Sequence, residues 1–152
     1  MSGIYSDRRP KIFFEDGFTL LELMIVAIVV GILAAIAVPQ YGNYLIQGKI
    51  PEAISNISTL RVKLEQYYQD NRTYVGACVA GTSAPLPSSS NFTYTCPSLT
   101  DAAFTVQAVG TGSMSGFTFQ IDQAGTQTTP AVPSSWGSGS YSCWVTKKGA
   151  SC

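Results

Sequence analysis

The sequence predicts an α+β fold, with one long N-terminal helix packed on an antiparallel sheet of about four strands. Three patterns lead to this prediction: an apolar run near the N-terminus, a helical repeat of apolar residues after it, and alternating apolar and polar residues in the second half of the chain. Only 12% of the 152 residues are charged, which is about half the share found in a soluble domain. Part of the chain is therefore expected to face something other than water.

The apolar run covers residues 18–38 and contains a single ionisable side chain, Glu22. About 20 apolar residues cross the core of a bilayer as a helix, so the run predicts a membrane span. The polar residues 1–17 precede it and end in Gly17. An ordinary secretory signal has a shorter apolar stretch with a small-residue cleavage site close behind it, and this sequence has neither.

Beyond the apolar run, apolar side chains recur at steps of three and four and form one stripe. They are Ile54, Ile57, Leu60, Leu64 and either Tyr67 or Tyr68. We predict one long helix from about Phe18 to Asp70, apolar all round in its first half and amphipathic in its second. Because proline costs a helix one hydrogen bond and clashes with the preceding turn, Pro39 is expected to interrupt it. Further weak points are Gly31, Gly42, Gly48 and Pro51.

The second half of the chain shows strand patterns. Residues 71–100 are rich in loop-forming residues and contain one short strand candidate at 92–95. Apolar and polar residues then alternate at 104–108 and 117–122, as in an antiparallel sheet covered on one face. Two further strand candidates are residues 126–129 and 144–146. The apolar face of this sheet and the apolar stripe of the helix are expected to cover each other.

The composition argues against an enzyme, a metal site and a cofactor. Histidine is absent, so a Ser-His or Cys-His nucleophile pair cannot form. The cysteines form no Cys-x-x-Cys pair, and Asp101 and Asp122 are isolated acids, so we expect no bound metal. Nine basic residues balance nine acidic ones. Nucleic acid is therefore not expected as a partner on grounds of bulk charge.

The chain has four cysteines, Cys78, Cys96, Cys143 and Cys152. An even number in a Ser/Thr-rich chain suggests two disulfides and an oxidising compartment. The alternative is four buried free thiols in a reducing compartment, which the predicted membrane span argues against. Four cysteines allow three connectivities. Proximity in sequence favours Cys78 with Cys96 and Cys143 with Cys152.

One short motif points to a family. Residues 17–22 read GFTLLE and are followed by LMIVAIVVGILAAIAVP. This resembles the class III signal sequence of type IV prepilins, with Gly17 before the cleavage point, Phe18 as the new N-terminus, Glu22 as the fifth mature residue and Pro39 as the twenty-second. The order of helix, loop, sheet and C-terminal cysteine loop also fits the pilin layout. The ending SCWVTKKGASC resembles that of the small PilE-like minor pilins.

The resemblance implies how the chain is processed. A separate prepilin peptidase cuts between Gly17 and Phe18 and methylates the new amine. Residues 1–17 are then a leader, residues 18–48 a transmembrane and assembly helix, and residues 49–152 a periplasmic or extracellular globular pilin domain. The chain is expected first in the inner membrane and then in a surface pilus. Its expected partners are other pilin subunits, the peptidase, the inner-membrane assembly machinery and, before assembly, membrane lipid.

Glu22 is the residue with the sharpest expected role. A lone carboxylate in an apolar run is costly unless it is paired or lies near the interface. Cleavage would place a cationic amine on Phe18, one helical turn away, which could pair with Glu22 of the same subunit or of a neighbour. Pilin behaviour favours the neighbour. The alternative is that Glu22 only reaches the lipid headgroups.

The resemblance also bears on Pro39 and on the C-terminal loop. It implies that Pro39 lets the helix melt locally during packing, with a simple kink as the alternative. It marks the loop between Cys143 and Cys152 as the disulfide-bound region where pilins meet partners, and the alternative is that the bond only pins a fraying terminus. Lys147 and Lys148 in this loop could bind DNA, but two lysines are few for phosphate binding. A solvated loop is the preferred interpretation.

The sequence therefore predicts a structural subunit of a type IV pilus, a minor pilin that supports pilus assembly, twitching motility, adhesion or DNA uptake. One alternative is a type II secretion pseudopilin, which shares the N-terminal motif but commonly lacks the C-terminal disulfide loop. Another is a DNA-binding pilin for natural transformation, which a gel-shift titration at several salt concentrations would distinguish. A membrane-anchored enzyme is a third alternative, for which the sequence offers no base, nucleophile or cofactor motif.

Overall fold

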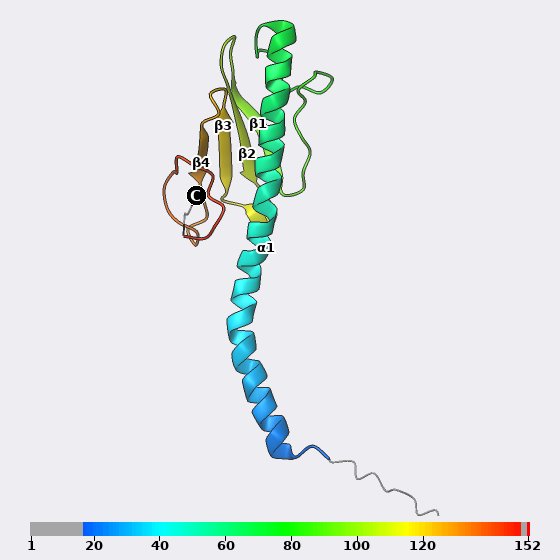
Figure 1. Cartoon of the computed structure of the whole chain (residues 1–152), viewed down its shortest axis with the longest axis vertical. Helices are drawn as coiled ribbons and strands as arrows, with labels where there is room; N and C mark the ends of the chain where they lie inside the picture. Colours follow the sequence, from blue (N-terminus) through cyan, green and yellow to red (C-terminus); the bar gives the residue numbers. More distant parts are fainter. Residues whose placement is uncertain (1–16, 150–151) are drawn as a thin grey trace, which may run out of the picture. The chain divides into compact units, whose positions relative to one another are not determined.

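The computed structural model describes residues 17–149 and Cys152, apart from the side chain of Pro39. Most of the predicted leader, residues 1–16, lies outside the described residues. The elements occur in the predicted order, one long helix and then a sheet (Figure 1). They are α1 (Leu20–Asn71), β1 (Phe92–Leu99), β2 (Phe104–Gly110), the 3-10 turn η1 (Gly112–Met114), β3 (Thr118–Asp122) and β4 (Gln127–Ala131).

The four strands form one sheet in the order β1-β2-β3-β4, and each neighbouring pair is antiparallel. This confirms the predicted α+β class and the predicted sheet of about four strands. The chain divides after Val38 into two units, residues 1–38 and residues 39–152. The first unit contributes the beginning of α1, and the second contains the rest of α1 and the whole sheet.

The helix is continuous from Leu20 to Asn71, so the interruption expected at Pro39 is not found. Proline removes one backbone hydrogen bond from a helix, and a glycine costs about 1 kcal/mol relative to alanine. At Pro51 the flanking residues offset this cost, since Ile50 and Ala53 are fully buried against the rest of the domain. Tertiary packing thus outweighs the local propensity that made this position look weak.

The core of the second unit lies between α1 and one face of the sheet, as Figure 1 shows for the C-terminal part of the helix. Strand pairing places Val106 opposite Ile121 and Ala108 opposite Phe119 on this face. The buried helix residues recur at steps of three and four: Ile50, Ala53, Ile57, Leu60 and Leu64. The prediction included the last three of these residues, Ile57, Leu60 and Leu64. It missed the first two, Ile50 and Ala53, because the predicted stripe began one turn too late. Ile54 is only partly buried.

Two details of the sheet region differ from prediction. Residues 110–116 are more than a turn, because η1 inserts Met114 into the core with no exposed surface. A side chain at Gly110 would collide with the carbonyl oxygen of Met114, so this close approach requires glycine. Residues 144–146 do not form the predicted last strand. The backbone N–H of Val145 bonds to the Thr129 hydroxyl, and the Trp144 side chain bonds to the Gln120 carbonyl.

Candidate functional site

The first feature is the start of α1, next to the predicted cleavage point. Gly17 and Phe18 are exposed and lie outside the helix. Thr19 caps the helix, because its Oγ1 accepts a hydrogen bond from the backbone N–H of Glu22 at 3.1 Å. The spacing of Thr19 and Glu22 matches the Ser/Thr-x-x-Glu pattern that starts many helices. Sequence reasoning missed this signal, which fixes the first helical residue just after the predicted cleavage point.

No neighbour within the described chain requires glycine at position 17. A Cβ built there would have nothing within 4 Å. The residue has no positive φ, so the backbone does not demand glycine either. The described residues therefore give no structural reason for glycine at this position.

The second feature is the exposed apolar surface of α1 between Leu20 and Val38. Its large hydrophobic side chains are 48–78% exposed. α1 is long and apolar enough to cross a membrane by its length and composition, and none of its most apolar window, with a mean hydropathy of 2.9, is buried within the chain. An apolar surface of this extent marks contact with lipid or protein.

Glu22 is the one ionisable residue on this surface. It lies in the first turn of α1, where the partial positive charge of the helix N-terminus favours a carboxylate. Among residues 17–149 and Cys152, no hydrogen bond to its carboxylate is found. Its expected pairing with an amine of a neighbouring subunit stays a prediction. Pro39 lies in α1 as the first residue of the second unit.

The third feature is the C-terminal loop. The structure contains the disulfide named from the sequence, Cys143–Cys152, with 5.9 Å between the Cα atoms. The loop is tied to the sheet by Thr129, which is fully buried. Its hydroxyl donates to the carbonyl of Cys143 at 2.7 Å and accepts the N–H of Val145 at 3.0 Å.

Trp144 anchors the same loop. It is 9% exposed, and its Nε1 donates to the carbonyl of Gln120 at 2.9 Å. Trp144 is thus an anchor and not a surface contact. The two lysines beyond it, Lys147 and Lys148, are exposed. The loop therefore presents positive charge on a base that is fixed to the sheet.

The fourth feature is the loop from residue 72 to residue 91, between α1 and β1. The second disulfide named from the sequence, Cys78–Cys96, joins it to β1 with 6.5 Å between the Cα atoms. Near its end, Glu52 of α1 accepts hydrogen bonds from the Ser89 hydroxyl at 2.5 Å and the Asn91 amide at 2.8 Å. These bonds, the Ser89 bond most of all, lower the pKa of Glu52, and Lys49 adds to the effect. Sequence reasoning missed this cluster because its residues are 37 and 39 positions apart.

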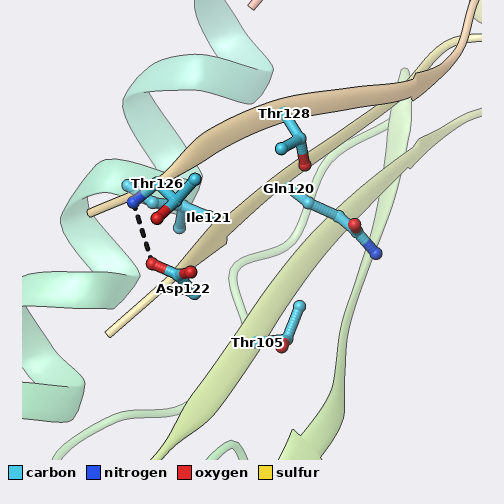
Figure 2. A pocket seen from close by; sticks show the side chains of 6 residues that line it. All are labelled: Thr105, Gln120, Ile121, Asp122, Thr126 and Thr128. Atoms are coloured by element: carbon cyan, nitrogen blue, oxygen red, sulfur yellow. Dashed lines mark hydrogen bonds between the residues drawn. The ribbon is translucent and has the colours of Figure 1, made fainter. Parts of the chain in front are cut away.

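The outward face of the sheet carries a polar pocket of about 220 Å³ (Figure 2). Its lining comes from β2, β3, β4 and the turn between the last two: Thr105, Gln120, Ile121, Asp122, Thr126 and Thr128. Asp122 closes the turn, since its Oδ1 accepts the N–H of Thr126 at 2.8 Å. Its carboxylate therefore has a structural role. In the part of the chain that the structure describes, no group of three or more His, Cys, Asp or Glu could hold a metal ion.

Comparison with protein families gives two matches. The family described as "Type IV minor pilin ComP, DNA uptake sequence receptor" matches residues 39–128. The prokaryotic N-terminal methylation motif matches residues 15–38. Together they cover the exposed apolar part of α1 and most of the domain that follows it in the sequence.

Curated relatives are fimbrial proteins. A type IV major fimbrial protein FimA of Dichelobacter nodosus is 34% identical over 67% of this chain and 57% of its own length. A fimbrial protein of Pseudomonas aeruginosa is 41% identical over 41% of each chain. A probable minor fimbrial protein of Dichelobacter nodosus is 42% identical over 40% of this chain and 38% of its own. The chain thus matches only about half of the length of such relatives.

The fold also has a counterpart among solved structures. The non-core minor pilin PilV of Neisseria meningitidis aligns with a TM-score of 0.50 and 15% identity, over 59% of this chain and 91% of that one. At this level of identity the likeness concerns the fold alone. It agrees with the helix-on-sheet arrangement in Figure 1.

Proposed function

The chain belongs to the type IV minor pilin family, and on this premise we propose that it is a membrane-inserted precursor whose mature form joins other pilin subunits in a filament. Like other pilins it is a structural subunit and not an enzyme. The observation that carries the proposal is the apolar surface from Leu20 to Val38. It is 48–78% exposed at its large side chains and needs lipid first and neighbouring helices later.

We propose cleavage between Gly17 and Phe18 by a prepilin peptidase and methylation of the Phe18 amine. The match of residues 15–38 to the methylation motif supports this. So does the environment of Gly17, where nothing in the described chain requires glycine. Glycine has no side chain to obstruct a protease, which would explain its presence at this position. Residues 49–152 would face the periplasm before the inner-membrane assembly machinery extracts the subunit.

Glu22 would then pair with the methylated Phe18 amine of a neighbouring subunit. The pair would form in an apolar environment, where an attraction between opposite charges is strong and an unpaired carboxylate is costly. Its geometric effect would be to set the axial stagger of the filament. Pro39 would let α1 adjust locally during packing, since a helix that lacks one hydrogen bond melts there first.

Replacement of the carboxylate tests this role. Glu22→Gln and Glu22→Val should leave membrane insertion and cleavage intact, and Glu22→Val should ease insertion. Both should deplete the subunit from sheared surface filaments, as measured by quantitative mass spectrometry, while Leu21→Val in the same turn should not. Normal incorporation of both Glu22 variants would contradict the pairing. Intact-mass analysis of filament protein checks the cleavage, and retention of residues 1–17 would contradict it.

DNA binding is a second candidate function, favoured by the description of the matched family as a DNA uptake sequence receptor. The bulk charge of the chain argued the other way. The exposed cations of the C-terminal loop, Lys147 and Lys148, are the residues that would contact phosphates. When a protein contacts phosphates, the logarithm of its binding constant falls linearly with the logarithm of the salt concentration.

A gel-shift titration at several salt concentrations tests this candidate. Binding that weakens with salt, with a smaller slope in the double variant Lys147→Gln/Lys148→Gln, would support it. Neutralising Lys63 on α1 is the control, because it also removes a positive charge but at a site outside the C-terminal loop. Absence of binding at low salt would rule out DNA binding and leave the structural role as the one proposed function.

A further inference from the structure

Four exposed residues of α1 form a surface with no role in the core. They are Tyr41, Tyr44, Leu45 and Gly48, here called the tyrosine face. Tyr41 is 65% exposed, Tyr44 73% and Leu45 47%. Because positions three, four and seven residues apart share one side of a helix, all four lie on the same side of α1.

The tyrosine face points away from the sheet. At about 100° per residue, its centre lies roughly 150° around the helix from the stripe that begins at Ile50 and Ala53. That stripe is fully buried in the domain. The domain's own sheet therefore cannot cover the tyrosine face, and two aromatic rings remain open to a partner outside the domain.

The sequence around the tyrosine face grades from apolar to charged. Tyr41 and Tyr44 follow Val38, the last residue of the apolar run, by three and six positions, and no charged residue occurs from 23 to 48. The first charge is Lys49, whose amine donates to the Ser113 hydroxyl at 2.8 Å. Next to the tyrosine face lies an apolar groove lined by Gly42, Leu45, Ile46, Lys49 and Ser113.

This order is the one that a bilayer interface selects. Tyrosine concentrates at the level of the lipid headgroups, where its ring meets acyl chains and its hydroxyl meets water. Contacts between helices favour small residues instead, and Tyr41 and Tyr44 are large. The chemistry of the tyrosine face therefore fits a phospholipid interface better than a second helix.

We propose that the tyrosine face seats the precursor at the phospholipid headgroups, on the side of the membrane that carries the globular domain. The inference rests on the membrane-inserted precursor of the proposed function. It adds the residues that fix how deep the helix sits: the rings of Tyr41 and Tyr44 lie in the interface, and Lys49 marks the start of the aqueous phase.

Depth-dependent fluorescence quenching tests the proposal on the full-length chain in phosphatidylcholine vesicles. Tyr44→Trp places a probe on the tyrosine face, and Val62→Trp places a matched probe on an α1 residue that is 59% exposed but outside it. The signal of Trp136 and Trp144 is subtracted with the unsubstituted protein. Carbonate extraction first shows whether the chain is inserted, so failure of the span is seen separately from failure of the inference.

The proposal predicts that lipids brominated near the headgroup quench the probe at position 44 about two times more strongly than lipids brominated near the bilayer centre. The probe at position 62 should respond to neither. An inserted chain whose position-44 probe is not quenched would overturn the proposal. So would protection of position 44 that grows with the protein-to-lipid ratio, because a second copy would then be the partner.

Discussion

The two halves of α1 show how one helix can serve two environments. From Leu20 to Val38 the large side chains are 48–78% exposed, whereas Ile50, Ile57, Leu60 and Leu64 are at most 1% exposed. Both halves are helical and rich in aliphatic residues. They differ in whether one side is polar. A helix with one apolar stripe can be covered by a single sheet, whereas a helix that is apolar all round cannot.

The two carboxylates of α1 repeat this contrast. Glu52 in the second half accepts hydrogen bonds from Ser89 and Asn91 of its own chain. Glu22 in the first half has no such bond to its carboxylate within residues 17–149 and Cys152. One acid thus stabilises the fold of a single chain, and the other is proposed to act between chains.

The largest expected effect comes from one substitution made in each half. Leu60→Ala should destabilise the domain by roughly 2–5 kcal/mol, because it leaves a cavity in a packed core. Leu33→Ala removes the same atoms from a side chain that is 61% exposed and should leave domain stability unchanged. Thermal unfolding of the full chain in detergent, followed by near-ultraviolet circular dichroism, measures both.

The comparison reverses in the filament. Leu33→Ala should lower incorporation into sheared filaments at normal domain stability, since its side chain is available to neighbouring helices. A melting temperature that falls equally in both variants would show that the first half is also part of the domain core. The contrast between the halves would then be wrong.

The disulfides should give the next largest effect, again limited to the second unit. In the chain-entropy model, loss of Cys78–Cys96 and of Cys143–Cys152 costs about 3 and about 2.5 kcal/mol, because the first closes the longer loop. Paired Cys→Ser variants and urea unfolding measure these costs. Retention of the chain in the membrane should not change in either variant. Loss of retention would mean that the two units depend on each other.

The smallest effect is the acid sensitivity of Glu52. Its pKa is lowered in the folded chain, mainly by the Ser89 and Asn91 bonds, so folding favours the ionised form. The stabilisation is present above the unfolded pKa and is lost as the pH falls through the folded pKa. Glu52→Gln should therefore have a lower melting temperature than the wild type near neutral pH. The difference between the two melting temperatures should become smaller in acid. Asp70→Asn, at an exposed carboxylate near the end of α1, is the control.

Much of the fold follows from periodic patterns. The steps of three and four at Ile57, Leu60 and Leu64 predicted the buried side of the helix, and the alternation around Val106 and Phe119 predicted the sheet. Such patterns report burial by an element's own neighbours. They missed the burial of Met114 and Trp136, because isolated apolar residues in Gly- and Ser-rich segments carry no period.

The candidate site was predictable where the signal is local. The GFTLLE motif named Gly17, Phe18 and Glu22, whose roles stay predictions, and proximity in sequence named the two disulfides that the structure contains. The links between distant residues could not be predicted, since nothing near Thr129 indicates that it binds the backbone on both sides of Trp144. The missing strand at residues 144–146 has the same cause, because the backbone N–H of Val145 bonds to the side chain of the distant Thr129.

Unfolding of the isolated fragment 46–152 tests the central claim most directly, namely that the apolar stripe in the second half of α1 is covered by the chain's own globular domain. The fragment begins at Ile46, which packs partly against the core, and lacks the apolar run and the two exposed tyrosines. Produced in an oxidising compartment, it should melt cooperatively at a temperature that does not depend on protein concentration, and at a lower temperature when reduced. Aggregation, or a melt without cooperativity in the oxidised fragment, would contradict the account.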